Sequence, residues 1–164
     1  MITRRDLLLT MIAIGDGSVE GRTRLTKLMY IVKVKLLELV NDLRHFLLRK
    51  KIREILDKYY EFKMHYYGPY SEELIKDLKI LENEGFITSE IVPLYDFYQY
   101  KYTVTDKGRR RAEDVIKELP DEILELFKWV KKKYGKAPLT LLLHDVYRTF
   151  RKIELKYTKK RRSF

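Results

Sequence analysis

The stretch SEELIKDLKILENEGFITSEIVPLYDFYQYKYTV, residues 71–104, decides the fold that we expect for this chain. Its first part predicts a helix that begins after Ser71, a residue type that caps helix N-termini well. Glu72 and Glu73 follow in the first turn, where the helix dipole favours negative charge. Leucines and isoleucines then recur every three or four residues as far as Gly85, which is expected to end the helix.

The second part of this stretch predicts a β-hairpin. Residues 86–92 and 97–104 are rich in β-branched and aromatic residues, and residues 93–96 have the composition of a turn. In residues 97–104 tyrosines alternate with polar residues, as in a strand with one buried face. This order of elements, helices followed by a β-hairpin, is typical of a winged-helix domain.

The residues before this stretch predict further helices. Thr3 and the aspartate three residues later match a capping box at the start of a first helix. Residues 22–59 contain neither glycine nor proline, and their apolar spacing slips near residue 50. They form either one very long helix or two helices that meet at the slip. The apolar seam from Leu25 to Leu47 predicts a homodimer through this region.

More helices are expected after the hairpin. Thr105 has the position of an N-cap, and Pro120 and Pro138 each stand where a proline starts a helix. The last residues, 151–164, carry seven basic side chains and one acidic side chain, and we expect them to form a frayed basic tail.

The length of 164 residues fits a single domain. We therefore expect a mostly helical α+β fold over residues 1–150, with a winged-helix-like core and appended C-terminal helices. Within it, residues 34–62 form an enlarged helical segment.

Composition limits the class of protein. Thirty-five lysines and arginines against 24 acidic residues give a net charge of +11, which favours partners that carry phosphates. The absence of cysteine excludes disulfides and thiolate metal sites. No apolar run reaches the roughly 18 residues that a membrane span needs, so we expect a cytoplasmic protein. A charged fraction of 36% suits a thermophile.

Basic residues from separate segments are the candidates for nucleic-acid contact. Such side chains bind phosphates and fix position without reading bases. The candidates are Arg22, Arg24, Lys27, Arg49, Lys50, Lys51, Arg53, Lys101, Arg109, Arg110, Arg111, Lys159, Lys160, Arg161 and Arg162. The alternative is that these are scattered side chains on a solvated surface.

The helix after Ser71 has a net charge of −3, which opposes its insertion into a DNA groove. It is an alternative candidate for protein docking, together with the tyrosines around the Gly-Pro step. The candidate docking residues are Tyr66, Tyr67, Tyr70, Glu72 and Glu73. In the other interpretation, the tyrosines only fill a core with their hydroxyl groups at its rim.

Catalysis has little support in the sequence. The three histidines are far apart and have no metal-ligand spacing. The chain has no HExxH motif, glycine-rich phosphate loop or nucleophile elbow. We therefore expect no enzyme activity, no cofactor and no metal.

Four segments carry a resemblance to a known family: GRTRLTKLMYIV, YYGPYSEELIKDLKILENEGFI, YTVTDKG and YGKAPLTLLLHDVY. Together they resemble the YwgA-like family of small prokaryotic proteins, and more distantly the Panacea or SocA-like antitoxin domain. The resemblance implies a winged-helix-like core. The more distant resemblance to antitoxin domains implies binding to partner proteins and sometimes to nucleic acid. The chain departs from the family in its longer region at 34–62 and in the basic tail after residue 150.

Two functions follow as hypotheses. The first is a non-enzymatic regulator that binds nucleic acid, DNA in particular, through the dispersed basic residues. The alternative is an antitoxin-like or adaptor-like module that binds a protein through the tyrosine-rich edge and the acidic helix.

Overall fold

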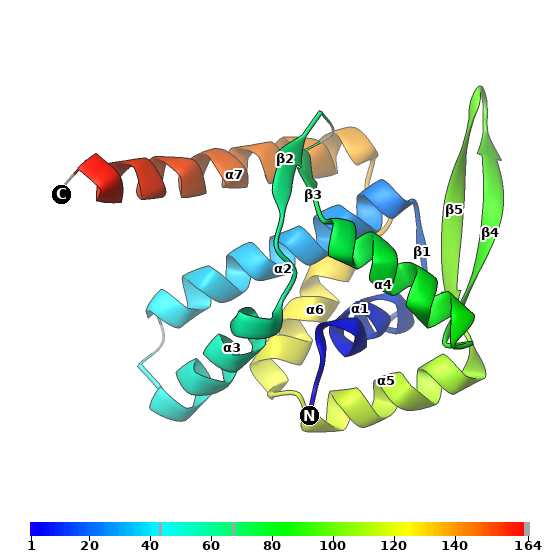
Figure 1. Ribbon diagram of the computed structural model, residues 1–164, viewed down its shortest axis with the longest axis horizontal. Coiled ribbons are helices and arrows are strands. Elements are labelled where there is room, and N and C mark those ends of the chain that lie inside the picture. Colours follow the sequence, from blue (N-terminus) through cyan, green and yellow to red (C-terminus); the bar gives the residue numbers. More distant parts are fainter. Residues whose placement is uncertain (43, 67, 163–164) are drawn as a thin grey trace.

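The computed structural model describes the backbone of residues 1–42, 44–66 and 68–162, and side chains as far as residue 151. The chain has the mostly helical α+β fold expected from the sequence (Figure 1). Its helices are α1 (Arg4–Ala13), α2 (Arg22–Asp42), α3 (Phe46–Lys58), α4 (Glu72–Asn83), α5 (Asp106–Glu118), α6 (Asp121–Tyr134) and α7 (Leu139–Arg162). Its strands are β1 (Ser18–Glu20), β2 (Lys63–His65), β3 (Gly68–Tyr70), β4 (Ile87–Leu94) and β5 (Phe97–Val104).

Helix α1 lies in the centre of the core. Its side chains from Leu7 to Ile12 are buried on every side of the helix, which is the pattern of a helix surrounded by protein. It contacts α4, α5, α6 and β5. The predicted capping box is present, since the Asp6 N–H donates to Thr3 Oγ1 (3.2 Å) and the Thr3 N–H donates to the Asp6 carboxylate (2.9 Å).

Strands β4 and β5 form the predicted hairpin, which we call the long hairpin. They pair antiparallel along their whole length, with Leu94 opposite Phe97. Tyr95 and Asp96 alone therefore form the turn, which is shorter than the turn expected at residues 93–96. In Figure 1 this hairpin projects from the body of the molecule.

Strand β1 was not predicted from the sequence. It pairs with β5 over residues 101–103, and the sheet has the strand order β1-β5-β4. Its central residue, Val19, is buried opposite Tyr102, so β1 attaches the foot of the long hairpin to the core.

The region predicted over residues 22–59 contains two helices, and their junction is not where we expected it. Helix α2 ends at Asp42 and α3 begins at Phe46, whereas the slip in the pattern lies near residue 50. His45 caps α3, because its Nδ1 accepts a hydrogen bond from a first-turn backbone N–H (3.2 Å). Neither glycine nor proline marks this junction, and histidine is an uncommon N-cap.

The apolar seam that suggested a homodimer lies mostly inside this chain. The seam residues from Leu25 to Leu36 are fully buried in the core. Leu47 is exposed, and Leu43 lies outside the described residues. The homodimer stays a prediction. Packing within one chain already accounts for the apolar residues of the seam.

A second, short hairpin was also missed by the sequence reasoning. It consists of strands β2 and β3, which pair antiparallel, and the Gly-Pro step lies within β3. Gly68 has a φ of +94°, and a side chain there would also crowd Lys27. The buried Lys27 ammonium donates to the Pro69 carbonyl (2.6 Å). Lys27 therefore holds the short hairpin on α2.

Thr105 connects the two helices that flank the long hairpin. Its hydroxyl donates to the Gly85 carbonyl (2.6 Å), after α4, and accepts from the Gly108 N–H (3.0 Å), in α5. A Cβ on Gly108 would lie 2.0 Å from the Phe86 carbonyl oxygen, so only glycine fits there. The segment TVTDKG, residues 103–108, thus has a structural role at the foot of the long hairpin.

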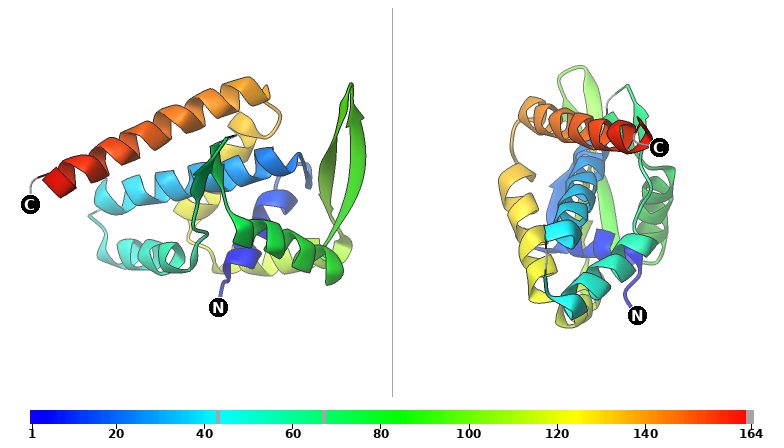
Figure 2. Two further views of the ribbon diagram at one scale, coloured as in Figure 1. Left: turned by 45° about the horizontal axis from the view of Figure 1, so that its top comes forward. Right: turned by 90° about the vertical axis from the view of Figure 1, so that its left-hand side faces the viewer.

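Helix α7 is longer than expected. Its backbone remains helical to Arg162, through residues that we expected to fray. Figures 1 and 2 show it beside α2, with its C-terminal part extending past the body of the molecule. No helix among the described residues is both long and apolar enough to span a membrane.

Candidate anion-binding site

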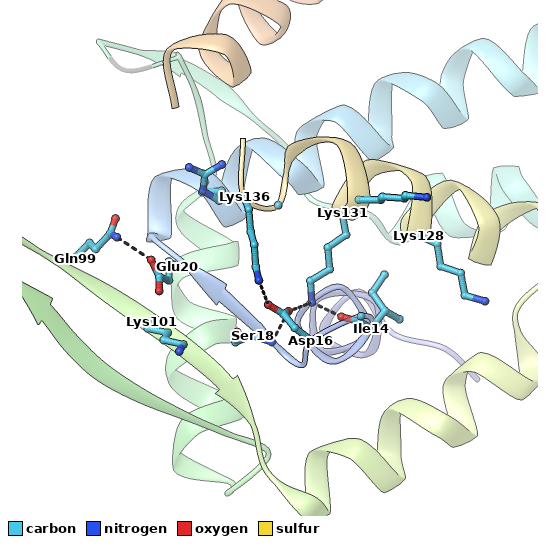
Figure 3. Close-up of a pocket in the computed structure, with 13 residues that line it drawn as sticks. Ile14, Asp16, Ser18, Glu20, Gln99, Lys101, Lys128, Lys131 and Lys136 are labelled. Atoms are coloured by element: carbon cyan, nitrogen blue, oxygen red, sulfur yellow. Dashed lines mark hydrogen bonds and ion pairs between the residues drawn. The ribbon is translucent and has the colours of Figure 1, made fainter. Parts of the chain in front are cut away.

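A cavity of about 910 Å³ lies beside the foot of the long hairpin (Figure 3). It is open to solvent and is bordered by the turn after α1, strand β1, the start of α2, strand β5 and the C-terminal half of α6. Its lining residues are Ile14, Gly15, Asp16, Ser18, Glu20, Arg24, Gln99, Lys101, Lys128, Lys131, Lys132, Gly135 and Lys136. We call this cavity the lysine pocket, because six of these residues are cationic and only two are acidic.

Helix α6 supplies most of the positive charge. Lys128 and Lys132 are one helical turn apart, and Lys136 continues the four-residue spacing just after the helix ends. Residues at this spacing share a face of the helix, and four residues advance by about 6 Å along its axis. The three side chains therefore form a stripe along the wall of the lysine pocket, and all three are exposed.

Lys131, on the same helix, has a structural role. Its side chain is only 9% exposed, and its ammonium donates to the carbonyl oxygens of Ile12 (2.7 Å) and Ile14 at the end of α1. Burial lowers its pKa to about 8, although the nearby carboxylate of Asp16 opposes that change. Lys131 therefore joins α6 to α1 and is not free to bind a ligand.

Asp16 lies in the middle of the lysine pocket (Figure 3). Its carboxylate is 3.3 Å from the Lys136 ammonium and 3.6 Å from that of Lys131, and it accepts from the Ser18 N–H (3.2 Å). Burial alone would raise its pKa, but this N–H and the two ammonium groups hold the pKa below its ordinary value. Asp16 stays ionised and pairs with both ammonium groups.

Arg24 and Lys101 are the predicted contact residues that the fold brings into the lysine pocket, among those whose side chains are described. The Arg24 guanidinium donates to the Tyr134 carbonyl (2.7 Å), which fixes the end of α6 to α2. Lys101 is on β5 with Glu20 opposite it on β1, and Gln99 two residues away donates to Glu20 (3.5 Å). With every group ionised, the lining carries a net charge of +4.

The other predicted basic residues lie elsewhere. The Arg22 guanidinium lies over the ring of Tyr100 (5.3 Å), and that of Arg111 pairs with Asp6 through two contacts of 3.0 Å. Arg110 is exposed on α5. The Arg109 guanidinium lies beside Gly17, next to the turn that borders the lysine pocket.

Two predicted groups do not contribute to the lysine pocket. The basic run of α3 is at the opposite end of the molecule from the long hairpin (Figure 1). It comprises Arg49, which is half-buried, and the exposed Lys50, Lys51 and Arg53. The side chains of Lys159, Lys160, Arg161 and Arg162 lie outside the described residues.

Sequence reasoning missed the lysines of α6. The available signal was KWVKKKYGK, residues 128–136, in which lysines recur every four residues before a glycine. From the sequence we predicted only a helix over residues 121–134. The residues around these lysines do not reveal that they lie opposite a strand formed by residues 97–104.

The acidic helix α4 is less negative toward solvent than its sequence suggests. The buried Asp77 accepts from Arg4 (3.1 Å) and from the Tyr60 hydroxyl (2.6 Å). Arg4 also lies 3.7 Å from Glu73, and Arg5 lies 3.6 Å from Asp77. The charge of the buried Asp77 is therefore neutralised by arginines of α1, and Glu73 pairs with one of them at the surface.

The predicted docking residues differ in their exposure to solvent. Tyr66 is 98% exposed at the tip of the short hairpin, and Glu72 is exposed at the start of α4. Tyr70 is half-buried and packs edge-on against His65, with the ring centroids 4.8 Å apart. Tyr67 lies outside the described residues.

Comparison with known proteins gives one named relative. The chain is similar to the uncharacterized protein YwgA of Bacillus subtilis, with 29% identity over 106 residues. The match covers 65% of this chain and 52% of that relative, so it spans about half of the relative's length. No family model matches the chain, and no solved structure matches it. This distant similarity supports the resemblance to a YwgA-like family.

Proposed function

We propose that this protein is a regulator that binds nucleic acid through the lysine pocket and its rim. The observation that carries the proposal is the gathering of cationic side chains from α2, β5 and α6 around one cavity, against two carboxylates. Lysines and arginines that neutralise phosphates release counterions, and this supplies much of the affinity of nucleic-acid-binding proteins. The proposal narrows the predicted contact from the dispersed basic residues to one cavity, where Arg24 and Lys101 join the lysines of α6.

The order of the elements supports a winged-helix assignment as part of this proposal. Helix, short strand, helices and hairpin follow one another, and the first strand pairs with the last in the order β1-β5-β4. In such domains the hairpin forms a wing beside the nucleic acid. Gln99 and Lys101 on β5 line the lysine pocket, so the wing forms part of its wall.

Two double charge reversals test the proposal. Lys128→Glu with Lys132→Glu changes the lysine pocket, and Lys50→Glu with Lys51→Glu makes the same change in charge on α3. Binding is measured by fluorescence anisotropy with labelled DNA and RNA of about 20 nucleotides, at several salt concentrations from about 50 mM. We expect the α6 variant to bind about tenfold or more weakly, and the α3 variant to lose less than about threefold.

Two outcomes would overturn the proposal. One is equal loss in both variants, because it would mean that only the total charge matters. The other is negligible binding by the natural protein at the lowest salt concentration. Circular dichroism on each variant confirms that the fold is intact.

Protein docking remains a second candidate function, favoured by the exposure of Tyr66 and Glu72. Exposed tyrosines are frequent at the centres of protein interfaces. A pull-down with the natural protein and with Tyr66→Ala tests it, and identical sets of captured proteins would argue against it.

A further inference from the structure

We infer that the nucleic acid bound at the lysine pocket is single-stranded, and that an unpaired base stacks on Phe97 of the long hairpin. The inference rests on the proposed function and specifies its ligand. It combines two elements that single-strand-binding proteins use together, a cationic groove along the backbone and an aromatic ring for a base.

The register of β5 places Phe97 on the pocket side of the hairpin. Successive side chains of a strand point to opposite faces, so Phe97, Gln99 and Lys101 share one face. Gln99 and Lys101 line the lysine pocket, and Figure 3 shows them at its hairpin end. Phe97 is the next residue along this face toward the tip.

Phe97 is available to a ligand. Its side chain is 62% exposed, although burial of a phenylalanine ring contributes strongly to folding. Its cross-strand partner is Leu94. A ring that the fold leaves in water beside a cationic cavity has the chemistry to stack on a base, because every base has an apolar face.

The stripe on α6 suits a strand backbone. Lys128, Lys132 and Lys136 extend the cationic surface away from the hairpin, at intervals of about 6 Å within the helix. Neighbouring phosphates of an extended strand have a comparable separation. A strand with its phosphates along α6 therefore brings its next bases toward Gln99 and Phe97.

A duplex fits these features less well. Its bases are stacked inside a stiff rod, so they cannot reach a ring at the side of a cavity without being unstacked. The helix before the hairpin, α4, is also poorly suited to a DNA groove, because Glu72 and Glu82 are exposed among its lysines. A single strand can bend into the lysine pocket and present its bases at no such cost.

The test compares two adjacent aromatic residues. Phe97 shares its strand face with Gln99 and Lys101, whereas Tyr98, which is 75% exposed, lies on the other face of the hairpin. Anisotropy is measured with labelled single-stranded DNA, single-stranded RNA and duplex DNA of the same sequence. We expect Phe97→Ala to weaken single-strand binding by about 5- to 30-fold, as loss of a stacked base does, and Tyr98→Ala to weaken it by less than about twofold.

Two further variants of Phe97 control for a change in the structure of the hairpin itself. Phe97→Trp keeps an aromatic face and should retain the affinity of the natural protein, whereas Phe97→Leu should resemble the alanine variant. The two single-strand probes show whether DNA or RNA is preferred.

The inference fails separately from the proposed function. Equal affinity for duplex and single strand, or equal effects of the two alanine variants, would overturn the inference. If the α6 charge reversal still abolished binding in that case, the proposed function would stand. Absence of binding to all three probes would overturn both.

Discussion

Helices α3 and α6 look alike in sequence and differ in what surrounds them. Each carries a run of cations, residues 49–53 in α3 and residues 128–136 around the end of α6. The α3 run is exposed to solvent except for the half-buried Arg49 and the buried Ile52. The α6 run faces a strand, a turn and the start of α2 across a cavity. A run of charged residues in the sequence therefore indicates only that a segment is exposed. It becomes part of a binding site where distant segments of the chain pack beside it to form a cavity.

The largest expected difference concerns stability. Lys131→Met on α6 leaves the carbonyl groups of Ile12 and Ile14 without their donor, which should cost about 1–3 kcal/mol in the free energy of unfolding. Lys51→Met on α3 changes an exposed side chain and should stay within about 0.5 kcal/mol. Urea unfolding of both variants measures this, and equal stabilities would contradict the structural role of Lys131.

The same lysine predicts a dependence of stability on pH. Its pKa is about 8 in the folded chain, below the ordinary value of 10.5, so the unfolded chain binds more protons between these values. The free energy of unfolding should therefore rise as pH increases from about 8, by roughly 1–2 kcal/mol up to pH 9.5. Lys27, whose pKa burial also lowers to about 8, acts in the same direction.

The control for this prediction is again the pair of methionine variants. Unfolding curves at pH 7.5 and 9.5 should show a smaller rise for Lys131→Met than for the natural protein, and an unchanged rise for Lys51→Met. A rise of equal size in all three proteins would assign the effect to other groups.

The salt dependence of binding sharpens the comparison between the two helices. Neutral substitution of Lys128 and Lys132 by glutamine should remove two phosphate contacts. The slope of log affinity against log salt should then become shallower by about 1.5. The same substitution of Lys50 and Lys51 should leave the slope unchanged. Equal slopes for both double variants would contradict the assignment of the contacts to α6.

The smallest effect is expected from a carboxylate in the lysine pocket. Asp16→Asn retains the oxygen that accepts from Ser18 but releases Lys136 for phosphate. Nucleic-acid affinity should rise about threefold, because a partly exposed ion pair contributes roughly 0.2–1 kcal/mol. Asp57→Asn on the exposed surface of α3 is the matched control and should change affinity by much less. Lower affinity for Asp16→Asn would mean that the carboxylate organises the site.

The parts of the fold that sequence predicted are those set by local interactions. The caps at Thr3, Ser71 and Thr105 need only neighbouring backbone groups, and all three are present. The long hairpin followed from alternation within one strand. Strand β1 was missed because three residues leave too little pattern, and its partner strand is more than 80 residues away in the chain.

The candidate site was harder to predict for the same reason. Arg24 and Lys101 were expected to contact phosphates, but nothing in the sequence placed them opposite the lysines of α6. Lys27 has the same chemistry, and the fold buries it on the Pro69 carbonyl. Residue type indicates which side chains can bind an anion, whereas burial decides which of them are available.

The unequal lengths of the strands have one more consequence. Strand β1 and the Gly21 N–H support β5 only as far as Tyr100 (2.7 Å), so beyond that residue the hairpin is held by its own cross-strand bonds. A lone pair of strands is barely stable in water. Backbone amides near Phe97 should exchange with solvent deuterium far sooner than those near Tyr102, without unfolding of the rest. Stacking of a base on Phe97 would then have to order the tip of the hairpin. Slower hydrogen exchange of these amides in the presence of nucleic acid would indicate that it binds there.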